Sequence, residues 1–168
     1  MERRLSIPVG VVAERMTIGN TWQGIAWRPA GVLIGETALT AGSLLRDDGR
    51  IAAYYAGDAR LELHPTDIDS YRHNLEQAVP RIYVVLAETA DDTSPAVLLV
   101  TAAPDEACSY FDGDGRMVDG VPMGRELAGL IEAYVAEHAR PAVPDKRRYR
   151  EQPRPAGDAT RMHMEGRS

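Results

Sequence analysis

The sequence predicts an α+β fold, with a mainly antiparallel sheet packed by helices near residues 66–79 and 123–140. Two observations lead to this class. In the first half of the chain, apolar and polar residues alternate with the two-residue period of half-buried strands. The second half contains two runs with the spacing of amphipathic helices. Strands that come first, followed by helical segments, are typical of α+β domains.

The length and the charge pattern divide the chain into a body and a tail. With 168 residues and 44% hydrophobic composition, the chain suits one domain with one core, over residues 1–140. Residues 141–168 contain four prolines, few apolar side chains, and seven basic against four acidic residues. Such a segment has almost nothing to bury, so we expect a disordered, basic tail that is dispensable for folding.

The composition also limits the environment and the class of partner. No apolar run approaches the roughly 20 residues that span a bilayer, so we expect no membrane insertion. One cysteine excludes an internal disulfide and agrees with a reducing compartment, and we expect a cytoplasmic protein. Residues 1–140 carry 12 basic and 21 acidic side chains, a net of −9. Because this body repels phosphate backbones, a nucleic-acid partner is not expected.

The first half should form an antiparallel meander. Residues 5–15 and 25–34 are rich in valine, isoleucine and leucine and predict strands. "RIAAYYA" and "ARLELH" follow, and we expect Gly57-Asp58 to split them into two strands. Further turn signals lie at 19–20 and 47–49.

The segment "SYRHNLEQAVPRIYVVL" predicts a helix that leads into a central strand. Thr66 is the expected N-cap, and Pro80 is expected to end the helix. At 100° per residue one stripe is apolar, and His73 lies nearly opposite it, toward water. "RIYVVLAE" is apolar on both faces, as a central strand is. The stripe consists of Ile68, Tyr71, Leu75 and Val79.

Four elements should complete the domain. "AVLLVTA" should pair back as the next strand, and Pro104 suits the first position of a short helix. Residues 117–121 predict a weak strand, before the helix over 123–140. The buried face of that helix is expected to hold Met123, Leu127, Leu130, Ile131, Tyr134 and Val135.

The residue types that carry catalysis or bind metals do not form a recognisable set. His64, His73 and His138 are not spaced to share a metal ion. The turn "DGDGRMVDGVPM" starts like a calcium loop but places Arg116 where an oxygen ligand belongs. Cys108 is expected to be a packed, inert thiol. With no phosphate-binding glycine loop either, we expect no catalytic residues, metal site or cofactor.

The stretch "NTWQGIAWRPAGV" is the best candidate for binding a partner. It holds both tryptophans of the chain, Trp22 and Trp27, next to Arg28. Aromatic and arginine side chains are the most frequent anchors of protein interfaces. A regular strand would place the two tryptophans on opposite faces, so that one packs in the core and the other stays available. The sequence does not indicate which of them is exposed.

Several segments resemble a bacterial family of unknown function. They are, in order, "PVGVVAER", "TWQGIAWRPAGVL", "AYYAGDARLELHPTDIDSYRHNLEQAVPRIYVVL" and "LLVTAAPDEACSYFDGDGRMVDGVPM". The family's genes commonly lie near those for molybdenum-dependent formate dehydrogenases, and some members are labelled molybdopterin-guanine dinucleotide biosynthesis protein A. The resemblance implies a role in a formate dehydrogenase system and supplies no catalytic residues.

Three functions compete on these grounds. We expect a non-enzymatic accessory protein that binds a molybdenum formate dehydrogenase component or an assembly factor. The alternative is an enzyme of molybdopterin-guanine dinucleotide biosynthesis, which would need a phosphate site built from Arg28, Arg72 and Arg81. A nucleic-acid binder that acts through its tail is disfavoured by the acidic body.

Overall fold

Two antiparallel sheets form the frame of the protein. The computed structural model describes residues 3–17, 25–89, 94–111 and 115–139. The larger sheet, sheet A, has the strand order β2-β1-β4-β3, and the smaller, sheet B, has the order β6-β5-β7. The strands of sheet A are β1 (Leu5–Thr17), β2 (Ile25–Ile34), β3 (Leu44–Asp47) and β4 (Ile51–Leu63). Those of sheet B are β5 (Arg81–Ala87), β6 (Ala96–Thr101) and β7 (Arg116–Pro122).

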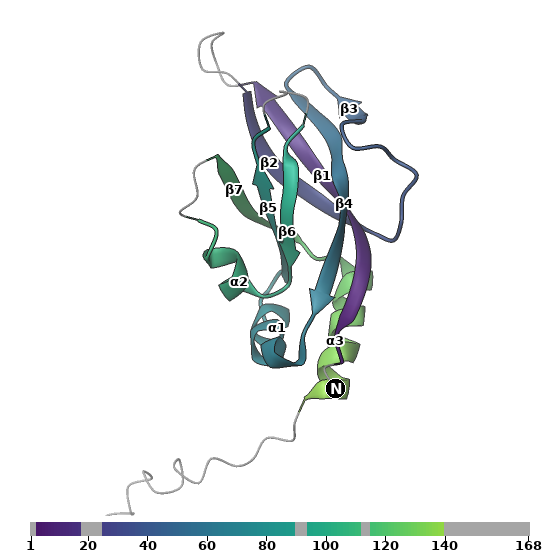
Figure 1. Ribbon diagram of the computed structural model, residues 1–168, viewed down its shortest axis with the longest axis vertical. Coiled ribbons are helices and arrows are strands. Elements are labelled where there is room, and N and C mark those ends of the chain that lie inside the picture. Colours follow the sequence, from purple (N-terminus) through teal and green to yellow (C-terminus); the bar gives the residue numbers. More distant parts are fainter. Residues whose placement is uncertain (1–2, 18–24, 90–93, 112–114, 140–168) are drawn as a thin grey trace, which may run out of the picture.

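Helical segments lie at one end of the two sheets and beside sheet B. The 3-10 helix η1 (Pro65–Asp67) leads into α1 (Ile68–Leu75), and α3 (Arg125–His138) follows β7. The short α2 (Pro104–Cys108) begins with proline, as predicted. In Figure 1, α1 and α3 lie at the lower end of the strands, with α2 beside β5 and β6. The prediction of an α+β fold with a mainly antiparallel sheet and helices is confirmed.

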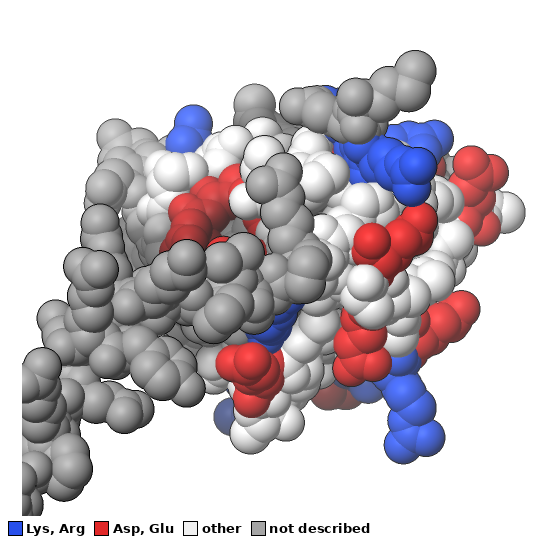
Figure 2. Space-filling model, turned by 90° about the horizontal axis from the view of Figure 1, so that it is seen from below, with Lys and Arg blue, Asp and Glu red and all other residues white. Residues whose placement is uncertain are grey.

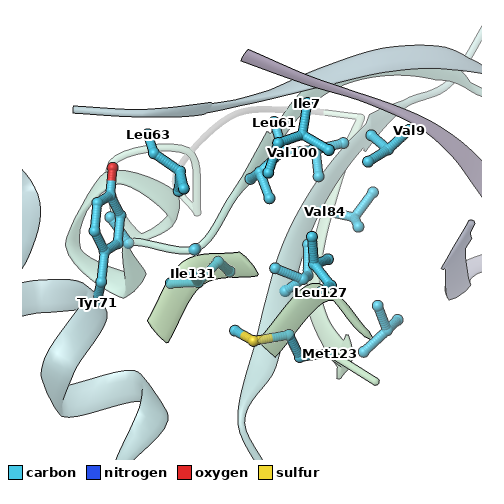
Figure 3. Close-up of a cluster of buried hydrophobic side chains, with 14 of the residues drawn as sticks. Ile7, Val9, Leu61, Leu63, Tyr71, Val84, Val100, Met123, Leu127 and Ile131 are labelled. Atoms are coloured by element: carbon cyan, nitrogen blue, oxygen red, sulfur yellow. The ribbon is translucent and has the colours of Figure 1, made fainter. Parts of the chain in front are cut away.

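One hydrophobic core joins the inner faces of both sheets to α1 and α3. Alternate residues of β1 point into it, because successive side chains of a strand lie on opposite faces. The helices contribute Tyr71 from α1 and Leu127 and Ile131 from α3. Figure 3 shows these side chains meeting others from β1, β4, β5 and β6. The strand residues are Ile7, Val9, Leu61, Leu63, Val84 and Val100.

The strand connectivity differs from the predicted meander. Strand β1 pairs with β4 as well as with β2, so residues far apart in the sequence, from Met16 with Ile51 to Leu5 with Leu63, form the centre of sheet A. The expected break at Gly57-Asp58 does not exist, because β4 continues through it. Gly57 has a φ of 152°, and the register shifts where Val11 pairs with it. The strand therefore absorbs an extra residue as a bulge, which a glycine at positive φ permits.

The first helix is shorter than predicted. Helix α1 ends at Leu75, and Val79, expected on the buried stripe, is 50% exposed. Thr66 is not the N-cap, because the 3-10 turn already begins at Pro65 and the cap residue of α1 is Asp67. His73 is exposed, as predicted.

The last helix nearly matches its prediction. Helix α3 begins at Arg125 and buries Leu127, Ile131, Tyr134 and Val135. Leu130, expected on the buried face, is 40% exposed. No helix in the described ranges is long and apolar enough to cross a membrane. The prediction of a disordered tail concerns residues 141–168, which lie outside the described part of the chain.

Candidate functional site

Two arginines flank one glutamate on the outer face of sheet A. Arg28 of β2 lies directly opposite Glu14 of β1, and its Nε and Nη2 donate to Glu14 Oε2 at 2.9 and 2.7 Å. Arg46 of β3 approaches Glu14 Oε1 at 3.8 Å from the other side, across the small Ala53 of β4. Glu14 is only 16% exposed, whereas Arg28 and Arg46 are 46% and 68% exposed. We call Arg28, Glu14 and Arg46 the outer row.

Trp27 lies on the opposite face of the same strand. It pairs with Arg15 and packs partly against the core, with its ring edge-to-face on Tyr54 at 5.4 Å between centroids. The Arg15 guanidinium lies over the Tyr54 ring, 5.2 Å from its centroid. The strand therefore separates Trp27 from Arg28, and the two do not form one contact surface. Trp22 lies outside the described residues.

The edge strand next to the outer row is exposed. All four residues of β3 are exposed, and Leu44 and Leu45 are 54% and 40% exposed. The register shifts between Leu44 and Arg46, so a bulge interrupts the edge. Bulges and charged side chains on edge strands oppose uncontrolled pairing with other chains. Arg46 therefore links the outer row to an exposed edge of sheet A, where Leu45 is also accessible.

The most elaborate side-chain network in the helix–strand segment belongs to Asn74, which the sequence analysis did not single out. Asn74 is 2% exposed. Its Nδ2 donates to the carbonyl oxygens of Arg81 and Ala102 at 2.7 and 2.8 Å, and its Oδ1 accepts from the Arg81 amide at 3.0 Å. Helical geometry offered a signal, because Asn74 lies only about 60° around the helix from Tyr71.

The histidines are not brought together. His73 is on the exposed side of α1, with Nδ1 3.9 Å from Glu76 Oε2. His64 directly follows β4, with Nε2 3.7 Å from Glu62 Oε2. Within the described ranges no group of three or more histidine, cysteine, aspartate or glutamate side chains is arranged to hold a metal ion. The expectation for Cys108 was wrong, since its side chain is exposed. Phe111, three residues further along the chain, is 61% exposed as well.

His138 is the histidine with the most unusual surroundings. Its Nδ1 donates to the Tyr134 carbonyl at 3.0 Å, and its ring lies 4.2 Å from the Tyr134 ring. The other nitrogen, Nε2, is buried and has no partner among the described residues. The ring borders an open hollow of about 400 Å³ between η1, α1 and α3, which Asp69 and Arg72 also line.

Three buried tyrosines hold their protons more strongly than usual. Burial raises the pKa of Tyr71 to about 12, against the hydrogen bond that its hydroxyl accepts from the His64 amide. Burial also raises the pKa of Tyr134, whose hydroxyl donates to the Arg3 carbonyl at 2.8 Å. The pKa of Tyr55 is raised by burial and by its hydrogen bond to Asp58. These hydroxyls have a structural role, because each makes a hydrogen bond with another residue of the fold.

The arginines proposed for a phosphate site are spread over three places. Arg28 belongs to the outer row, Arg72 pairs with Asp69 at 3.7 Å on α1, and Arg81 donates to the Gly120 carbonyl at 3.0 Å in sheet B. Arg72 and Arg81 border different hollows. The fold therefore offers no common site for these three side chains.

Comparison with known proteins gives one family. The family model described as "Protein of unknown function (DUF3305)" matches residues 8–148. No curated protein and no solved structure matches the chain.

Proposed function

Because the chain belongs to the DUF3305 family of proteins of unknown function, we propose its role from its surface and from the sequence resemblance described above. The protein is a non-enzymatic, cytoplasmic accessory protein. It binds a component of a molybdenum-dependent formate dehydrogenase system, or one of its assembly factors. The choice of partner rests on the resemblance alone, and the proposal that it acts by binding rests on the outer row.

The outer row has the properties of an interface anchor. The carboxylate of Glu14 holds the Arg28 guanidinium through two hydrogen bonds, so Arg28 loses little side-chain freedom when a partner docks. The two positive charges of Arg28 and Arg46 exceed the single negative charge of Glu14. The outer row therefore attracts an acidic group of a partner. The exposed Leu45, next to Arg46 in β3, supplies apolar area at the same sheet edge.

Trp27 has a supporting part in this proposal. Its ring packs on Tyr54 and the core, which holds β2 in place behind Arg28. Trp22 belongs to the same stretch of sequence and is kept as a second contact, although it lies outside the described residues.

Copurification tests the identity of the partner. The tagged protein would be recovered from a bacterium that encodes both this chain and the dehydrogenase, and its partners identified by mass spectrometry. We expect a dehydrogenase subunit or an assembly factor to be enriched over an untagged control. Enrichment of unrelated proteins only would contradict the proposed partner.

Paired variants test the proposed surface. Arg28→Ala with Arg46→Ala should weaken binding of the purified partner by about 2 kcal/mol or more, the scale of an interface anchor. The matched control is Arg60→Ala with Arg125→Ala, which removes the same charge from two exposed sites elsewhere. Equal binding by both double variants, each folded by circular dichroism, would remove the outer row from the interface.

Calorimetry tests the competing enzymatic function. An enzyme of molybdopterin-guanine dinucleotide biosynthesis must bind GTP with magnesium and transfer a guanylyl group. We expect no heat of binding beyond dilution, since the three candidate arginines lie apart. Saturable GTP binding together with transfer activity would replace the accessory function.

A further inference from the structure

A groove separate from the outer row lies where α1 leads into sheet B. It has a volume of about 520 Å³ and is open to solvent. Its walls come from the end of α1, the segment before β5, the first residues of β5 and the start of α2. The lining residues are His73, Asn74, Gln77, Ala78, Val79, Arg81, Tyr83 and Pro104.

The side chains that line this groove include one permanent cation and no carboxylate, although the body as a whole is acidic. Residues 1–140 carry a net charge of −9, and acidic side chains are spread over the face in Figure 2. The lining of the groove contains a guanidinium, Arg81, and an imidazole, His73, and no carboxylate. Acidic residues next to the lining are Glu76, whose carboxylate is 3.9 Å from His73, Asp105, which follows Pro104 in α2, and Asp119, which precedes the Gly120 that accepts from Arg81. An anionic ligand is therefore favoured over a cationic one.

Arg81 is held in place on both its main chain and its side chain. Asn74 clasps its amide and carbonyl, and its Nη1 donates to the Gly120 carbonyl. The side chain lies close over Gly120, where a Cβ would come within 3.0 Å of Arg81 Cδ. Glycine at this position leaves room for the arginine. Nε and Nη2, on the other edge of the guanidinium, make no hydrogen bond or ion pair with the described residues, so this edge can donate to the two oxygens of a carboxylate.

The remaining surface of the groove suits an aliphatic side chain. Val79 is 50% exposed, and Ala78, Pro104 and the ring of Tyr83 border the same space. An exposed valine beside a fixed arginine matches an acidic residue with an apolar neighbour. A free phosphate would find only one fixed cation here, whereas phosphate sites usually offer several donors.

We propose that this groove binds a short acidic peptide segment of a partner protein, with a carboxylate on Arg81 and an adjacent aliphatic side chain on Val79. The site goes beyond the proposed function, because it uses none of the outer-row residues. Its binding would be retained in the Arg28→Ala, Arg46→Ala variant, so failure of one proposal leaves the other standing.

Nuclear magnetic resonance titration can test this groove with defined probes. The probes are acetyl-Leu-Glu-Leu-amide, the matched acetyl-Leu-Gln-Leu-amide and inorganic phosphate, each added up to about 10 mM to reach weak affinities. We expect the glutamate peptide to shift the amides of Val79, Arg81 and Tyr83 saturably. The glutamine peptide should bind at least about tenfold more weakly, because it lacks the charge-assisted hydrogen bonds.

Variants of the protein locate the response. Arg81→Gln should lower the affinity for the glutamate peptide by about tenfold or more. Val79→Asp, which places a carboxylate in the groove, should lower it to a similar extent. Arg125→Gln removes one exposed charge from α3 and should leave binding unchanged. Equal binding of both peptides, no saturable shift, phosphate binding alone, or full affinity in folded Arg81→Gln and Val79→Asp would each overturn the proposal.

Discussion

The side chain of Asn74 clasps the main chain of Arg81, accepting from its amide at 3.0 Å and donating to its carbonyl at 2.7 Å. Nδ2 of Asn74 also donates to the carbonyl of Ala102, the residue directly after β6. One buried side chain thus joins the end of α1 to strands β5 and β6. The sequence around it predicts a helix–strand joint, and the structure identifies the residue that fixes the joint.

Asn74→Ala should lower the free energy of unfolding by about 2–4 kcal/mol, because it leaves buried main-chain groups without partners. His73→Ala, next to it on the exposed side of α1, should change the value by no more than about 0.5 kcal/mol. Leu75→Ala should cost about 2 kcal/mol, at the low end for a core leucine, since Leu75 is only partly buried. Urea unfolding of the three variants measures these stability losses. A large loss for His73→Ala together with no loss for Asn74→Ala would contradict the observed buried side of α1.

Gly10→Ala should destabilise the protein through Tyr55. A Cβ at Gly10 would come within 2.5 Å of the Tyr55 hydroxyl oxygen, and Tyr55 is fully buried and hydrogen-bonded to Asp58. We expect a loss of about 1–3 kcal/mol or more, as for other overpacked sites. The matched control is Gly31→Ala on β2, where a Cβ meets no atom within 4 Å.

A double-mutant cycle isolates this contact. Gly10→Ala in a Tyr55→Ala background should cost less than in the native background, because the clashing ring is gone. Thermal unfolding of the four proteins gives the coupling energy. Strict additivity would mean that the strain at Gly10 comes from somewhere other than Tyr55.

The stability of the protein should fall between about pH 10 and about pH 12, because the pKa of Tyr71 is about 12 when folded and about 10 when unfolded. Above the unfolded pKa, the unfolded chain has released this proton and the folded chain has not, so rising pH favours unfolding. The contribution of Tyr71 is present in full below pH 10 and is lost as pH rises through its folded pKa.

Urea unfolding at about pH 9 and about pH 11.5 measures this effect. Tyr71→Phe should unfold more easily at the lower pH, since the His64 amide loses its acceptor, and should lose less stability on going to the higher pH. Part of the pH dependence of stability should remain in the variant, because burial also raises the pKa of Tyr134. An unchanged slope in Tyr71→Phe would exclude Tyr71 as a source.

Cys108 should react fully in the folded protein. Its side chain is exposed at the end of α2, so an aromatic disulfide reagent should label the one thiol of each chain without denaturant. The rate should be within about tenfold of the rate in urea, as for an accessible thiol. Absorbance of the released thiolate and intact mass follow the reaction, and a thiol protected until unfolding would contradict the exposed position.

The sequence predicts local elements better than their partners. Strands β1, β2 and β5 follow from alternation or from runs of valine and isoleucine, because these patterns depend on neighbours in the chain. The pairing of β1 with β4 and the division into two sheets depend on contacts between distant residues, which periodicity does not record.

The errors at single residues have local causes. The apolar stripe in the sequence continues to Val79, but α1 ends at Leu75. Just before that end, the side chain of Asn74 forms hydrogen bonds with the main chain of Arg81. Gly57 resembles a turn in sequence, although it is a bulge within one strand. In the candidate site, "WRP" drew attention to Arg28, whereas Glu14 and Arg46 join it only through the register of sheet A.

The hydroxyl of Tyr134 donates to the Arg3 carbonyl and lies 3.2 Å from the carbonyl of Leu63, which precedes it by 71 residues. On a translating ribosome, β1 and β4 are therefore complete well before α3, the helix that packs against one end of their inner face. At ordinary elongation speeds the delay is roughly 4 to 14 seconds. During this time, Val9, Leu61 and Leu63 of the nascent chain lack the contacts of Leu127 and Ile131. Because exposed apolar surface of a partly folded chain promotes aggregation, we expect chaperones to bind this chain during synthesis.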